Sequence, residues 1–120
     1  MLVFIKRYIT AINQLEIAFK TKKLREICED CNKAEELLGE DVSRKLASRL
    51  SDLRACESIE QLPVGNPSEV VIGGKRTISI NIAQKVHLYF SSNHVSQSKN
   101  NRVDWSKVYR IKIVQIEGLT

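Results

Sequence analysis

Hydrophobic and polar positions follow two different periods along the first half of the chain. In residues 15–19 (LEIAF) they alternate singly, which predicts a half-buried strand. From Lys20 onward the spacing becomes helical, and the apolar positions on one face are Leu24, Ile27, Cys28, Cys31, Ala34, Leu37 and Leu38. This pattern predicts one amphipathic helix, with Gly39 as its C-terminal cap.

The residues after Gly39 predict a second amphipathic helix. Asp41 is a candidate N-cap, because its carboxylate can accept hydrogen bonds from the first free amides of a helix. The apolar stripe that follows consists of Val42, Leu46, Leu50, Leu53 and Cys56. Two amphipathic helices with so short a connection are expected to form an antiparallel hairpin.

The second half of the chain alternates as a set of strands does. A connection rich in Pro, Gly and Asn occupies residues 63–67, and Gly73-Gly74 is a hairpin signal. The strand candidates are residues 69–72, 77–82, 85–90 and 108–117. The polar segment 91–104 is long for a loop in so small a domain. We therefore predict an α+β fold, with an N-terminal strand and a two-helix hairpin packed on a mainly antiparallel, twisted sheet of about three to five strands.

The positive charge of the chain is confined to the second half. Residues 1–63 contain 11 Lys/Arg and 11 Asp/Glu, whereas residues 64–120 contain 8 and 3, which accounts for the net charge of +5. A hydrophobic content of 42% with 28% charged residues is typical of a folded domain. The asymmetry favours a partner rich in phosphate, although mild basicity can also serve solubility alone.

The cysteines predict a reduced protein. Their number is odd, and Cys28 and Cys31 form a C-x-x-C pair without a second pair to complete a metal site. Because Cys28, Cys31 and Cys56 all fall on predicted apolar helix faces, we expect them in the core. We predict no metal and no cofactor.

The first residues do not predict a targeting or membrane segment. Lys6 and Arg7 come after the short apolar run instead of before it, and the run is too short to span a bilayer. We therefore expect a cytoplasmic protein without membrane contact. Residues 1–14 are an N-terminal extension of unknown role, and residues 15–120 are expected to form a single domain.

Alternation along the strands separates a core side from an open side. The positions expected to face the helices are Ile78, Ile80, Ile82, Val86, Leu88, Phe90, Tyr109, Ile111 and Ile113. The open side then carries Ser79, Asn81, Lys85, His87, Tyr89, Arg110 and Lys112, with Lys75 and Arg76 at its rim. Cations pair with phosphates, a tyrosine can stack on a base, and hydroxyl and amide groups contact sugars, so this surface predicts RNA binding. The alternative is a solvated sheet face.

Four strings, in this order and spacing, resemble a known family. They are LEIAFKTKKLREIC at residues 15–28, GGKRTISINI at 73–82, HLYF at 87–90 and VDWSKVYRIKIVQIE at 103–117. Together they make residues 15–120 similar to the HigB-type plasmid-maintenance killer proteins of the RelE/ParE superfamily. The resemblance implies a RelE-like fold, a helix-turn-helix antitoxin of the HigA kind, and a toxin that enters the ribosomal A site and cuts mRNA.

The resemblance also implies roles for individual residues. Cleavage through the 2′-OH needs a proton acceptor, cations for the phosphate and an acid for the leaving oxygen. Lys75 and Arg76 match the family's basic hairpin positions, and His87 stands where the family usually has an arginine, so these three are the catalytic candidates. The RNA-binding candidates are Lys85, Tyr89, Ser79, Asn81, Lys99, Arg102, Arg110 and Lys112.

Two departures from the family predict weakened cleavage. His87 removes a permanent bidentate phosphate clamp, and the chain ends in Leu119-Thr120 where active relatives have an acidic, Tyr and His cluster. The leading hypothesis is a ribosome-dependent mRNA endonuclease. The second is a non-catalytic protein of the same fold that binds antitoxin or ribosome. A ParE-like gyrase inhibitor ranks last, because the Lys75-Arg76 hairpin and the Asp104-Trp105 segment are more similar to HigB.

Overall fold

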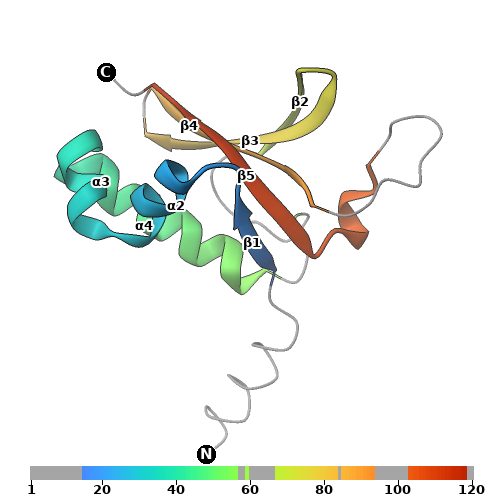
Figure 1. Cartoon of the computed structure of the whole chain (residues 1–120). Coiled ribbons are helices and arrows are strands. Elements are labelled where there is room, and N and C mark those ends of the chain that lie inside the picture. Colours follow the sequence, from blue (N-terminus) through green and yellow to red (C-terminus); the bar gives the residue numbers. More distant parts are fainter. Residues whose placement is uncertain (1–14, 57–58, 60–66, 84, 94–102, 119–120) are drawn as a thin grey trace, which may run out of the picture.

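A mixed sheet with helices on one face dominates the computed structural model, which describes residues 15–56, 59, 67–83, 85–93 and 103–118 (Figure 1). The strands are β1 (Glu16–Phe19), β2 (Ser68–Ile72), β3 (Lys75–Ala83), β4 (Val86–Ser92) and β5 (Arg110–Glu117). Their order is β1-β5-β4-β3-β2; β1 is parallel to β5, and the other neighbours are antiparallel. The predicted α+β class and mainly antiparallel sheet are confirmed. The expectation for residues 1–14 lies outside the described residues.

The first predicted helix is divided in two at Asp30. Helix α2 (Lys22–Glu29) begins at Thr21, whose side chain accepts from the amide of Leu24. Asp30 has extended backbone, and its Oδ1 accepts from the amides of Asn32 and Lys33, which starts α3 (Cys31–Leu38). The prediction of a single helix was therefore wrong: the Asp30 side chain competes with the continuing helical hydrogen bonds and caps a new helix.

This break changes the environment of the cysteines. Cys31 is the first residue of α3 and is exposed, so its predicted place in the core was wrong. Cys56 is buried as predicted, and Cys28 is half-buried against the core. Burial raises the pKa of the Cys28 thiol to about 12. Cys28 therefore stays a neutral packing residue at ordinary pH.

Gly39 joins α3 directly to α4 (Glu40–Ala55). It ends α3 with a φ of 87° and also occupies the N-cap position of α4, where it provides no side-chain cap. Asp41 lies in the first turn of α4 instead, so its predicted capping role was wrong. Its carboxylate pairs with Lys45 Nζ at 3.2 Å, one turn along the helix.

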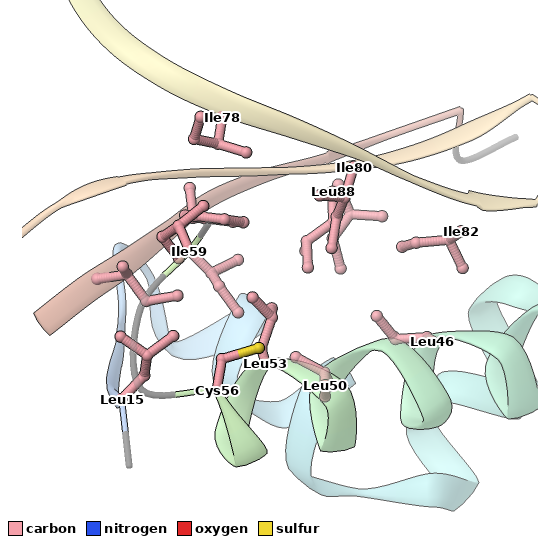
Figure 2. Packing of buried hydrophobic residues seen from close by; sticks show 14 of the residues in the cluster. Leu15, Leu46, Leu50, Leu53, Cys56, Ile59, Ile78, Ile80, Ile82 and Leu88 are labelled. Carbon is pink, nitrogen blue, oxygen red and sulfur yellow. The ribbon is translucent and has the colours of Figure 1, made fainter. Parts of the chain in front are cut away.

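The core lies between α4 and the sheet. Leu46, Leu50 and Leu53 of α4 are buried as the apolar stripe predicted, and they point toward the isoleucines of β3 (Figure 2). Ile80 and Leu88 lie directly above α4 in the same view. The inward positions predicted on β3 and β4 are confirmed: Ile78, Ile80, Ile82, Val86, Leu88 and Phe90 are all buried. Within the described ranges, the helices lack the length and apolarity that a membrane crossing requires.

The β2–β3 hairpin turns at Gly73-Gly74 as predicted. Both glycines have positive φ, 58° and 78°, which suits the turn that matches the twist of two antiparallel strands. The register pairs Ile72 with Lys75 and Val70 with Thr77.

A bulge in β5 changes the expected alternation of the last strand. Tyr89 pairs with Gln115 but Phe90 pairs with Ile113, so Val114 is an extra residue on β5. As a result Ile113 and Ile116 are both buried, and Gln115 shares a face with Tyr89. Ile111 and Ile113 are buried as predicted. Tyr109 is not: it precedes β5 and is 49% exposed, so its predicted inward orientation was wrong.

Gly118 provides a test of the packing between β5 and the β3–β4 turn. Its φ is 96°, and a Cβ there would overlap the backbone carbonyl of Lys85. We expect Gly118→Ala to lower the free energy of unfolding by about 2 kcal/mol or more, since strain and steric overlap add. Urea denaturation followed by circular dichroism measures the change. Gly39→Ala is the matched control, because Gly39 has φ of 87° with open space around it. Equal losses in the two variants would contradict the steric argument.

Candidate nucleic-acid interface

The face of the sheet opposite the helices, called the open face below, is made of three polar rows across β3, β4 and β5. Directly paired residues of antiparallel strands point to the same face. The register places Asn81, His87 and Glu117 in the first row, Ser79, Tyr89 and Gln115 in the second, and Thr77, Ser91 and Lys112 in the third. Among the described residues no helix covers this face (Figure 1). The residue type thus changes along the strands. The rows that contain His87 and Tyr89 are called the ionisable end below, and the row that contains Lys112 is called the basic end.

The ionisable end is organised around Tyr89. Its hydroxyl donates a hydrogen bond to the carboxylate of Glu117. The His87 ring lies beside the Tyr89 ring, with a centroid separation of 6.4 Å and a 45° tilt. The hydrogen bond to Glu117, followed by partial burial, raises the pKa of Tyr89 above its ordinary value near 10. Tyr89 is therefore a protonated hydrogen-bond donor and a stacking surface at neutral pH, and the His87 ring lies next to it.

The Glu117 bond predicts a pH dependence. Because the folded state raises the pKa of Tyr89, the stabilisation that this contact contributes is complete below pH 10 and is lost as pH rises through the folded-state pKa. In the Glu117→Gln variant we expect the pKa of Tyr89 to fall toward its ordinary value. Carbon-13 NMR of the tyrosine Cζ atoms measures it directly, with Tyr109 as the internal control. An unchanged Tyr89 titration would show that Glu117 does not set it.

The basic end surrounds a hollow of about 270 Å³ on the open face. Lys20, Lys75 and Lys112 line it together with Thr77 and Ser91, and the remaining lining residues are Ile72, Gly73, Val114 and Gln115. Lys20 follows β1, Lys75 begins β3 and Lys112 lies in β5, so three separate elements contribute a cation. Called the Ser91 hollow below, this feature contains two of the predicted residues, Lys75 and Lys112.

Lys20, Ser91 and Gln115 were missed by sequence reasoning, whereas Thr77 has the expected outward alternation of Ser79 but was not among the predicted RNA-binding residues. Ser91 could have been found, because it shares the alternation of Tyr89. Lys20 could not, since its position depends on the parallel pairing of β1 with β5, where the Lys20 amide donates to the Ile113 carbonyl at 2.8 Å.

Arg76 does not join the open face. It pairs with Val71 on the side of the sheet that carries Ile78, and its Nη1 contacts Glu69 Oε1 at 2.9 Å. The other carboxylate oxygen of Glu69 accepts from the indole N–H of Trp105. The structure thus places Arg76 on the opposite face from His87, in a contact that ties the β2–β3 hairpin to the short 3-10 helix Trp105–Lys107.

The other predicted RNA-binding residues are distributed around the open face. Ser79, Asn81 and Tyr89 lie on it, and Lys85 is exposed in the β3–β4 turn. Arg110 begins β5, where its Nε contacts Glu16 Oε2 at 2.8 Å and its guanidinium stacks 5.2 Å from the Tyr109 ring. Lys99 and Arg102 lie outside the described residues.

Comparison of the chain with family models, with curated proteins and with solved structures gives no match. The residues of the open face and their geometry are therefore the basis for assigning a function.

Proposed function

We propose that the chain is a RelE-like toxin of a type II toxin-antitoxin system, a ribosome-dependent mRNA endonuclease with weakened cleavage that binds RNA on its open face. One observation carries the proposal: in the part of the chain that the structure describes, a sheet face without helical cover combines lysines that have no acidic partner with a tyrosine and a histidine in adjacent rows. Lysines neutralise phosphates and tyrosine stacks on unpaired bases, which is the chemistry of single-stranded RNA recognition. The α+β architecture is compatible with the family that the sequence resembles. A HigA-like antitoxin and a cytoplasmic location belong to the same proposal.

The residues suited to cleavage meet at the ionisable end. His87 supplies the proton acceptor or donor that attack by a 2′-OH requires, and Tyr89 supplies a protonated hydroxyl beside it. Asn81 pairs with His87 across β3 and β4 and offers an amide for the ribose or a phosphate oxygen.

The separation of the two ends supports the proposal that cleavage is weakened. His87 and Ser91 are four positions apart on β4, about 13 Å at roughly 3.3 Å per residue. The lysines of the Ser91 hollow therefore bind the strand without stabilising charge at a phosphate next to His87. Arg76, on the opposite face, cannot replace them there. The same separation favours a second candidate function, a protein that binds RNA or ribosome without cutting.

Cleavage is tested by incubating the purified protein with a defined mRNA, with and without programmed ribosomes, and mapping the ends by primer extension. Cuts that appear only with ribosomes support the endonuclease. His87→Ala should then abolish cutting while antitoxin binding is retained. The sequence has two histidines, and His94→Ala, at the other one, is the control. An intact message that still binds the protein supports the second candidate. Absence of RNA and ribosome binding overturns both, and a DNA supercoiling assay then tests the ParE-like alternative.

A further inference from the structure

Several described lysines have no acidic partner among the described residues, and three of them, Lys20, Lys75 and Lys112, line the Ser91 hollow together. Lys33, Lys45 and Lys107 each lie within 4.0 Å of a carboxylate three or four residues away. No described carboxylate lies within that distance of Lys20, Lys75 or Lys112. Three ammonium groups around one hollow repel one another, and an anion between them converts that repulsion into attraction.

A second, independent observation comes from the hydroxyl groups of the hollow. Ser91 is 1% exposed and Thr77 is 2% exposed. Thr77 Oγ1 donates to the Lys75 carbonyl at 3.1 Å, but the buried Ser91 Oγ has no hydrogen-bond partner among the described residues. A buried hydroxyl without a partner is destabilising, so it marks a position where an acceptor oxygen belongs.

Size and charge together define the ligand. The hollow of about 270 Å³ is several times the roughly 30 Å³ that one water molecule occupies in the liquid. It therefore accommodates a tetrahedral oxyanion. Three cations favour a ligand with more than one charged oxygen, and the Ser91 hydroxyl can donate to one of them.

We infer that the Ser91 hollow binds a phosphate group of the RNA strand, distinct from the phosphate next to His87. The inference rests on the proposed function, because it takes the phosphate from RNA lying on the open face. The spacing of about 13 Å between His87 and Ser91 exceeds what a single phosphate group bridges. Anchoring a neighbouring nucleotide in the hollow sets which nucleotide reaches His87. The hollow is thus a positioning site for the strand.

The first experiment uses inorganic phosphate as the probe, titrated into the nitrogen-15-labelled full chain and followed by NMR. We expect the amide signals of Thr77, Ser91 and Lys112 to shift together with one dissociation constant. Lys112→Gln should weaken that binding at least tenfold, and Ser91→Ala about threefold or more. Lys33→Gln, a lysine on the helical side, is the matched control and should change nothing. The dispersion of each variant's spectrum shows that it is folded.

The second experiment adds a short oligoribonucleotide to the same samples. Competition between the oligonucleotide and phosphate for the Ser91 signals supports the inference. In the contrary case, RNA shifts the NMR signals of His87 and Tyr89 and binds the Lys112→Gln and Ser91→Ala variants as tightly as it binds the original chain. That result overturns the inference and leaves the proposed function standing. Localised phosphate binding without RNA binding overturns RNA as the source of the phosphate, whereas the proposed function is decided separately by the experiment with programmed ribosomes. Phosphate shifts spread over all lysines overturn the site itself.

Discussion

Replacing Phe90 with alanine is expected to lower the free energy of unfolding by about 3–5 kcal/mol. Phe90 is fully buried on β4, between Ile78 of β3 and Ile113 of β5 in the register. Its ring also meets the Trp105 ring edge-on, at a centroid separation of 6.4 Å and an interplanar angle of 86°. The substitution removes this aromatic contact and leaves a cavity in the middle of the sheet. Because a domain of this size is stable by only about 5–15 kcal/mol, much of its stability would be lost.

Urea denaturation followed by circular dichroism measures the Phe90 effect. Phe90→Leu, which nearly conserves volume, should cost less than about 1.5 kcal/mol. Tyr109→Ala is the exposed control, and we expect it to cost less than about 1 kcal/mol, since Tyr109 is 49% exposed. A loss below 1 kcal/mol in Phe90→Ala would contradict the central position of this side chain in the core.

Replacing Lys75 and Lys112 together with glutamine is expected to weaken RNA binding about 30-fold near 0.1 M salt. Each ammonium–phosphate contact near water contributes about 1 kcal/mol, so two contacts contribute about 2 kcal/mol. The logarithm of the binding constant should also depend less steeply on the logarithm of salt concentration. For single strands the slope is about −0.7 per phosphate contact, so the loss of two contacts flattens it by about 1.4.

Fluorescence anisotropy of a labelled oligoribonucleotide, measured across a range of salt concentrations, gives both quantities. Lys33→Gln combined with Lys45→Gln is the matched control. It removes the same charge from the helical side, where each lysine is paired with a carboxylate. Equal salt slopes in the two double variants would show that RNA does not lie over the Ser91 hollow.

Much of the sheet could be predicted from residue patterns, because strand alternation is a local property. The isoleucines of β3 must face one side once that strand forms, and the Gly73-Gly74 pair must turn where two glycines tolerate positive φ. The same alternation also separates Arg76 from Lys75. Arg76 is two residues from Ile78 on the same strand and therefore lies on the helical side. This alternation was already visible in the sequence.

Competition between a side chain and the backbone hydrogen bonds of a helix limited the prediction of the helices. Asp30 lies inside a continuous helical pattern, yet its carboxylate binds the amides of Asn32 and Lys33 and begins a new helix. Hydrophobic periodicity does not register this competition, because the apolar positions keep their spacing across the break. The exposure of Cys31 follows from it.

By itself, the sequence determined the α+β class, the inward residues of β3 and β4, and the basic character of the second half of the chain. Only the tertiary structure decided what the open face contains. The pairing of β1 with β5 brings Lys20 beside Lys112, and the bulge at Val114 turns Gln115 toward the same face. Both depend on contacts between segments far apart in the chain. Periodicity describes each segment alone, whereas the Ser91 hollow exists only after the end of β1, the β2–β3 hairpin, β4 and β5 have packed together.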